Sequence, residues 1–107
     1  ESETGKYNNV KNVPLPSGCS WYDYKIALDE KILPRIKSFK PDLIIVSAGF
    51  DAHKSDPLAG MNLLSDDFGK MTEIMLDIQP KTLLGLEGGY NLNALADSVE
   101  FVISKLI

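Results

Sequence analysis

The sequence is poor in the side chains that most often hold metals or form cross-links. Its 107 residues include one cysteine, Cys19, and one histidine, His53. A single cysteine excludes an internal disulfide and a cysteine-rich zinc module. A single histidine excludes any site that needs two or more imidazoles from this chain, although it leaves room for a self-contained catalytic triad.

The sequence also lacks long hydrophobic runs and an excess of positive charge. No apolar stretch approaches the roughly 20 residues that span a bilayer, and the first stretch has neither region of a signal peptide. Fifteen acidic against eleven basic residues give a net charge of −4, which offers no general attraction for nucleic acid or anionic lipid. With 44% hydrophobic residues, the chain has the composition of one ordinary soluble domain. It begins at Glu1 without a methionine, so we expect a piece of a longer protein.

The order of the expected elements indicates an α/β fold with a mainly parallel sheet. Helices are predicted where apolar residues recur every three or four positions, and strands where short apolar runs lie between proline and glycine. In chain order we expect an edge strand at 9–15, a helix at 21–39 that kinks or breaks at Pro34, a strand at 42–49 buried on both faces, a loop at 50–64, a helix at 65–79, a strand at 82–86, a turn, and a helix at 92–106. Three strands make a thin sheet for this class, which again favours a missing remainder.

The two later helices carry start signals and an apolar face. Ser65 and Asn91 are the predicted N-caps. The inward faces are expected to hold Phe68, Met71, Ile74, Met75 and Ile78 in one helix, and Leu92, Leu95, Val99, Ile103 and Leu106 in the other.

Polar side chains that could do chemistry follow the two apolar strands. Sites in open parallel sheets form at the carboxyl ends of the strands, so Asp51 and Tyr90 are expected to face one pocket. Asp51 either caps its own loop or serves as a hard oxygen ligand for a divalent metal. Tyr90 either packs on the last helix or donates a hydrogen bond to an oxyanion.

Other candidate groups are weaker. Asp51, His53 and Asp56 resemble a compact metal cluster, but Asp56-Pro57 is typical of a turn and His53 is expected to be a solvated loop residue. The two glycines before Tyr90 lack the spacing of a phosphate-binding loop. Cys19 has no basic neighbour that would lower its pKa, and no serine has the surroundings of a hydrolase nucleophile.

Two long motifs resemble the C-terminal third of the histone deacetylase superfamily. The first covers residues 41–53 (PDLIIVSAGFDAH) and continues at 56–60 (DPLAG), and the second covers residues 86–92 (LEGGYNL). With Phe50 and Glu87, the sequences of these motifs are most similar to those of the class II branch and of bacterial and acetoin-utilisation-like relatives. The resemblance implies that residues 1–107 are the C-terminal part of one catalytic domain with a three-layer, arginase/deacetylase-like α/β fold.

The resemblance also implies a role for individual residues. Asp51 corresponds to the second aspartate of an Asp/His/Asp zinc site, and Tyr90 to the tyrosine that polarises the substrate carbonyl and holds the oxyanion. Leu58 falls at the rim of the acetyl-lysine channel, and Gly88 and Gly89 lie beside it. His53 falls outside the family's ligand pair and is expected not to bind the metal.

The implied function is a zinc-dependent amidohydrolase that deacetylates acetyl-lysine in histones or other proteins. Residues 1–107 contain no His-His pair. The resemblance places the family's Asp-x-His ligand pair upstream, so Asp51-Ala52-His53 only looks like it, and the chain alone is expected to be inactive. Alternatives are a deacetylase of small acetylated amines, of the polyamine or acetoin-utilisation type, and a non-catalytic interaction module. We expect an intracellular location, cytoplasmic or nuclear, with no direct contact to nucleic acid or membrane.

Overall fold

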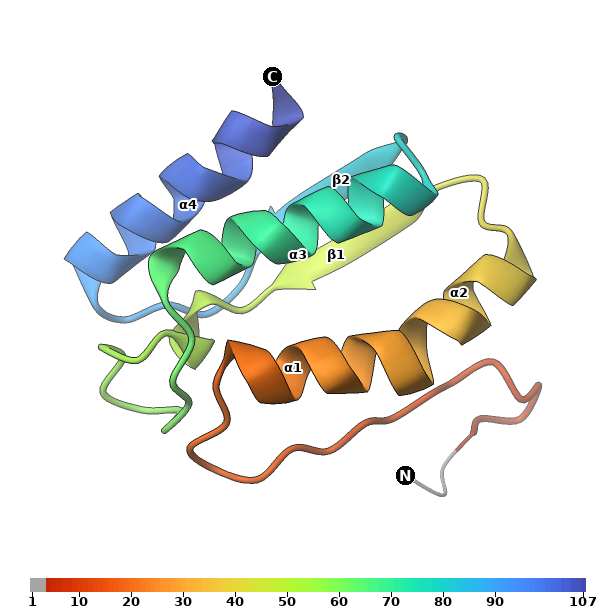
Figure 1. The fold of residues 1–107 in the computed structure, drawn as a ribbon, viewed down its shortest axis with the longest axis horizontal. Helices are drawn as coiled ribbons and strands as arrows, with labels where there is room; N and C mark the ends of the chain where they lie inside the picture. Colours follow the sequence, from red (N-terminus) through yellow and green to blue (C-terminus); the bar gives the residue numbers. More distant parts are fainter. Residues whose placement is uncertain (1–3) are drawn as a thin grey trace.

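Two five-residue strands form a parallel pair at the centre of the computed structural model, which describes residues 4–107 (Figure 1). Strand β1 (Ile44–Ala48) lies beside β2 (Thr82–Leu86), with Ala48 opposite Leu86 at their carboxyl ends. The helix α3 (Ser65–Ile78) connects the two strands. Both apolar strands and their parallel arrangement are therefore as predicted from the sequence.

The helices cover only one face of this sheet within the described part of the chain. Val46, Ala48 and Leu84 are partly buried toward α3 and α4. The alternate residues Ile45 and Leu83 are 66% and 59% exposed. The expectation that the first strand is buried on both faces is wrong for these residues, because no element between residues 4 and 107 covers the second face.

The first helix is one bent unit in three parts. It runs from α1 (Trp21–Ala27) through a π-helical segment (Leu28–Ile32) into α2 (Leu33–Phe39). Pro34 lies in the first turn of α2, where its missing N–H costs little, and the irregular segment directly precedes it. The predicted kink or break at Pro34 takes the form of this π-helical segment in a continuous, bent helix. Lys40 ends the helix in a left-handed conformation with φ of 56°.

The edge strand expected at 9–15 is absent. These residues have no regular secondary structure, and most of them are exposed. The segment includes Pro14, which cannot donate to a ladder, and no neighbouring strand in residues 4–107 offers it a partner.

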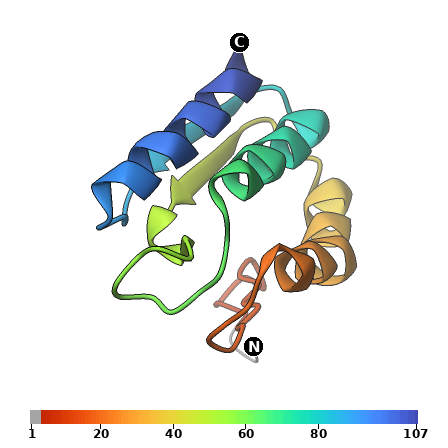
Figure 2. The same ribbon diagram turned by 60° about the vertical axis from the view of Figure 1, so that its left-hand side comes forward.

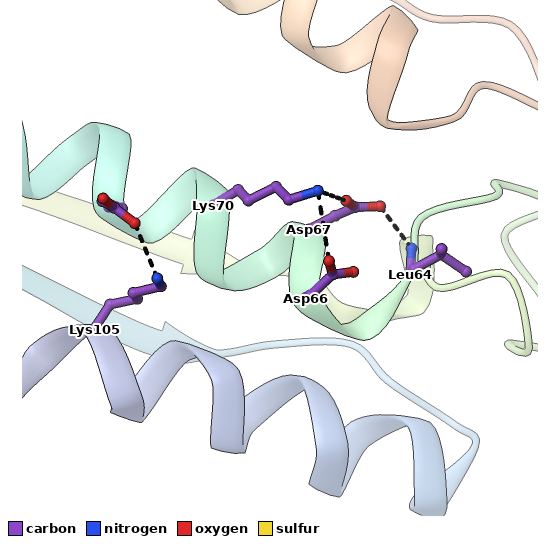
Figure 3. A network of polar contacts seen from close by, with 6 residues as sticks. Leu64, Asp66, Asp67, Lys70 and Lys105 are labelled. Carbon is purple, nitrogen blue, oxygen red and sulfur yellow. Dashed lines mark hydrogen bonds and ion pairs between the residues drawn. The ribbon is translucent and has the colours of Figure 1, made fainter.

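The start of α3 differs from the prediction that Ser65 is its N-cap. Leu64 occupies the cap position, and its backbone N–H donates to Asp67 Oδ2 at 2.8 Å (Figure 3). Lys70 Nζ lies 3.2 Å from Asp67 Oδ1 and 3.5 Å from Asp66 Oδ2. Acidic side chains in the first turn therefore cap the N-terminus of α3, and the Ser65 side chain is available for another contact.

Helix α4 (Leu92–Leu106) has the predicted bounds and N-cap, with Asn91 Oδ1 accepting from the Ala94 N–H at 3.0 Å. Its buried face differs from the predicted one. Leu95 and Val99 pack on the core, but Leu92, Ile103 and Leu106 are exposed, and the buried positions are Ala94, Ser98 and Val102.

Close approach of the two long helices explains this shift (Figure 2). Helices α3 and α4 lie side by side, and a Cβ on Gly69 would stand only 3.1 Å from the Phe101 carbonyl oxygen. At that separation the facing positions of α4 must be small, so alanine and serine replace the larger residues of the apolar stripe.

The core lies beneath the carboxyl ends of the strands. It consists of Phe50, Leu63, Phe68 and Val102, and the rings of Phe50 and Phe68 are 5.0 Å apart. Phe50 directly precedes Asp51, so the candidate carboxylate starts from an anchored backbone.

Among the described residues, none of the helices has the length and apolar character of a membrane span.

Candidate functional site

Two loops meet where the parallel strands end. We call residues 49–60 the Asp51 loop and residues 87–91 the Tyr90 loop. The Glu87 N–H donates to Ala48 O at 3.0 Å, and the Phe50 N–H donates to Gly88 O at 2.9 Å. The hydrogen-bond ladder therefore continues past the strands and fixes the start of each loop against the other.

Asp51 lies between two glycines that leave room for its carboxylate. A Cβ on Gly88 would stand 2.9 Å from Asp51 Cγ, and one on Gly49 would stand 2.9 Å from Asp51 Oδ1. Within residues 4–107 the Asp51 side chain makes no hydrogen bond or ion pair. Its oxygens are thus available to a ligand, and it does not cap its own loop.

The carboxylate that does cap the loop is Asp56. Its Oδ1 accepts the Leu58 N–H at 2.8 Å, and its Oδ2 accepts the Tyr90 N–H at 2.9 Å. Burial alone would raise the pKa of the Asp56 carboxyl, but backbone N–H donors outweigh it and hold the pKa below its ordinary value. These donors are the N–H groups of Leu58, Tyr90 and Ala59.

The sequence predicted only half of this arrangement. The bond to Leu58 is the expected turn at Asp56-Pro57. The bond to Tyr90 spans 34 positions, and no local pattern in the sequence signals it.

His53 is buried, which corrects the expectation of a solvated loop residue. It is 8% exposed, and its ring lies parallel to that of Phe68 with centroids 6.4 Å apart. The Ser55 N–H donates to Nδ1 at 2.9 Å, so the neutral ring carries its hydrogen on Nε2 and donates it to Ser65 Oγ, also at 2.9 Å. Both ring nitrogens are therefore hydrogen-bonded within the protein.

Tyr90 presents its side chain to solvent while its backbone is fixed. The residue is 58% exposed, and its N–H is held by Asp56. The preceding Gly89 has φ of 139°, and a Cβ there would stand 3.0 Å from Leu95 Cδ1 and 3.1 Å from Phe50 Cβ. Glycine is therefore required before Tyr90 on both conformational and steric grounds.

The remaining predicted site residues lie in the same two loops. Leu58 is 70% exposed in the Asp51 loop, and Gly88 contacts Asp51 from the Tyr90 loop. A cavity of about 260 Å³ lies beneath β1, lined by residues such as Tyr24, Val46 and Phe68, but neither Asp51 nor Tyr90 lines it. The two loops meet at the strand ends, and the pocket expected to be shared by Asp51 and Tyr90 stays a prediction.

Two further side chains near the site, those of Tyr24 and Cys19, have raised pKa values. Burial, followed by the nearby Cys19 and Asp51, raises the pKa of the Tyr24 phenol. Burial and then Asp23 raise the pKa of the Cys19 thiol, which agrees with the absence of a nucleophile signal around it.

The metal-binding capacity of the site is limited to one carboxylate. No group of three or more histidine, cysteine, aspartate or glutamate side chains between residues 4 and 107 is arranged to hold a metal. The free hard oxygens of Asp51 fit a single ligand position of a divalent metal, and any other ligands must come from outside these residues.

Comparisons with known proteins place this geometry in a family context. The model of the histone deacetylase domain matches residues 1–106. A protein of Synechocystis sp. described as uncharacterized is 47% identical over 105 residues, which are 98% of this chain and 34% of that protein. Histone deacetylase 10, chloroplastic, of Oryza sativa subsp. japonica is 43% identical over 93 residues, which are 82% of this chain and 21% of the rice protein.

A solved structure agrees in fold. The crystal structure of the HDA15 HD domain superposes with a TM-score of 0.81 at 38% identity, covering 85% of this chain and 27% of that one. The chain thus spans about a third or less of the length of the relatives it matches.

Proposed function

Because the chain belongs to the histone deacetylase family, we propose that it forms the C-terminal part of a zinc-dependent amidohydrolase. The full-length enzyme would remove acetyl groups from acetyl-lysine in histones or other proteins. The observation that carries the proposal is the free Asp51 carboxylate lying against Gly88, two residues before Tyr90. A metal ligand and a hydrogen-bond donor thereby stand at one edge of the sheet.

In the proposed site Asp51 is one zinc ligand and Tyr90 is the hydrogen-bond donor. When bound, zinc lowers the pKa of a coordinated water and polarises the acetyl carbonyl. The exposed Tyr90 phenol donates its O–H to the carbonyl oxygen as negative charge develops there. Because a catalytic zinc site needs about three protein ligands, the other ligands and the acid–base groups lie in the rest of the full-length protein.

The substrate assignment depends on Leu58. We place Leu58, Gly88 and Gly89 along the channel that would receive the lysine side chain. An exposed leucine offers apolar contact to the aliphatic stem of lysine and no charge for the second amine of a polyamine. This favours acetyl-lysine over a small acetylated polyamine.

The test uses the full-length protein with an acetyl-lysine peptide. Tyr90→Phe should lower kcat by about 10²–10³-fold because it removes one oxyanion donor. Asp51→Asn should weaken zinc binding and abolish turnover, and a chelator should do the same reversibly. The matched control Tyr22→Phe changes an exposed tyrosine on α1 and should leave the rate unchanged.

The contrary outcomes separate the alternatives. Faster turnover of an acetylated polyamine than of the peptide would favour the small-amine deacetylase. No turnover of either substrate by zinc-loaded full-length protein would favour an interaction module. Chelator-sensitive activity in the isolated 107-residue chain would contradict the division of the site between two parts of the protein.

A further inference from the structure

We propose that Asp56 is a positioning residue that holds Tyr90, and with it the channel-rim residue Leu58, in a fixed relation to Asp51. The proposal rests on the proposed function, since it assigns how that site is assembled. It concerns a buried carboxylate that contacts neither the metal ligand nor the phenol.

The geometry of Asp56 makes it a bridge between the two loops. One carboxylate oxygen accepts the Leu58 N–H at 2.8 Å and the other accepts the Tyr90 N–H at 2.9 Å. The residue is only 9% exposed, so water competes little for these bonds. Hydrogen bonds to an ionised acceptor are stronger than those between neutral groups, which suits a single side chain that must hold two segments.

Tyr90 needs such an anchor because little else holds it. Its side chain is exposed, so packing does not fix it, and it follows two glycines whose backbone is intrinsically flexible. The Gly88 carbonyl and the Asn91 side chain each bond to the Asp51 loop, at 2.9 and 3.3 Å. Between those two contacts, Asp56 is the partner that fixes the Tyr90 peptide plane, from which the phenol extends.

Asparagine is the informative replacement at this position. It keeps the shape of Asp56, but its carbonyl oxygen accepts at one end while its amide presents N–H groups at the other. One of the two backbone N–H groups then faces a donor and loses its bond. In either orientation of the amide the bridge between the Leu58 and Tyr90 N–H groups is broken, without the removal of any side chain that would touch substrate.

The decisive experiment is a double-mutant cycle in the full-length protein. Asp56→Asn should lower kcat by roughly tenfold to hundredfold while KM changes little, because the phenol is misplaced. In a Tyr90→Phe background the same change should cost little, since there is no phenol left to position. An equal loss in both backgrounds, or a loss confined to KM, would overturn the proposal.

Asp67→Asn is the matched control. Asp67 is also buried, at 3% exposed, and it also accepts a backbone N–H, that of Leu64, at the start of α3. It is therefore also a buried capping carboxylate, but its bonds go to the Leu64 N–H and to Lys70 Nζ (Figure 3) and not to the Tyr90 loop. Its replacement should cost the same factor with and without the Tyr90 phenol, as a purely structural effect does.

Hydrogen exchange separates this proposal from the proposed function. In wild-type protein the Tyr90 amide should be protected although its side chain is exposed, and Asp56→Asn but not Asp67→Asn should lower that protection. Protection without deacetylase activity would refute the proposed function and leave the Asp56 bridge intact. Fast exchange of the wild-type Tyr90 amide would refute the bridge, even if Asp56→Asn did not fold.

Discussion

At the scale of single residues, Gly88 is one of two glycines whose backbone lies directly against the candidate metal ligand Asp51. Its φ lies outside the left-handed region, so alanine is conformationally allowed there. The obstacle is the Asp51 carboxylate, which an added Cβ would meet at 2.9 Å. A glycine is therefore needed at position 88 to leave space for the Asp51 carboxylate, and not because of the conformation of its own backbone.

Gly88→Ala should impair the site more than the fold. We expect the carboxylate of Asp51 to be displaced, with weaker zinc binding and at least about a tenfold loss of kcat in the full-length protein. Zinc titration and thermal unfolding of the same sample would check both halves of this expectation.

Gly85→Ala is the control for Gly88→Ala. Gly85 lies in β2, three residues earlier, and the nearest atom to an added Cβ is the Val46 carbonyl oxygen at 4.0 Å. That variant should bind zinc as the wild type does. Equal losses of zinc binding in the two variants would show that any alanine near the end of this strand has the same effect, and that contact with Asp51 is not the cause.

At the scale of elements, local signals fixed the ends of helices and strands better than their faces. The bounds of β2 and α4 and the Asn91 cap followed from apolar runs and a cap residue within a few positions. The buried face of α4 did not, because it depends on how closely α3 approaches at Gly69. The distance between two packed helices depends on the side chains of both helices, so the apolar periodicity of one helix cannot predict it.

The same distinction applies to the site. Asp51 and Tyr90 could be placed at one sheet edge because the carboxyl ends of parallel strands meet there. The contacts of His53 with Ser65 and of Asp56 with Tyr90 join residues 12 and 34 positions apart. No spacing rule covers such pairs, so their burial and bonding became visible only in the fold.

The α3–α4 contact leads to a prediction about stability. Ser98 is fully buried, and its hydroxyl has no hydrogen-bond partner among residues 4–107. Ser98→Ala removes an unsatisfied polar atom at almost constant shape and should stabilise the protein by about 1 kcal/mol. Urea unfolding of the full-length protein would measure the change.

Gly69→Ala tests the same contact with the opposite sign. At a solvent-exposed helix position this change would stabilise the protein by about 1 kcal/mol, because alanine is the better helix former. Here the new Cβ would press on the Phe101 carbonyl at 3.1 Å, so we expect a net loss of stability. A stabilised Gly69→Ala together with a destabilised Ser98→Ala would contradict the close packing of the two helices.

At the scale of the whole molecule, one side of the sheet is apolar and bare in the described residues. Leu43, Ile45 and Leu83 are all more than half exposed, and the strand pair has free edges. Exposed apolar patches and unpaired edges promote association. The 107-residue chain produced alone should therefore self-associate, which sedimentation velocity at increasing concentration would reveal.

Charge on the sheet face should reverse this association. Leu83→Lys places an ammonium group in the patch, whereas Leu92→Lys changes an even more exposed leucine at the start of α4. We expect the first variant to sediment as a smaller species and the second to behave as the wild type. Association that both variants weaken equally would point to a surface other than the sheet.

The bridge from Asp56 to Tyr90 also has a consequence for the order in which the chain folds. It joins residues 34 positions apart, at the ends of the paired strands β1 and β2, so we expect it to form after those strands have paired. The turns of α3 and α4 depend on contacts within a few positions and carry no such entropic cost of closure. We therefore expect the loops that hold Asp51 and Tyr90 to assemble late. Asp56→Asn should then raise the unfolding rate of the full-length protein and leave its folding rate nearly unchanged, which stopped-flow unfolding and refolding would measure.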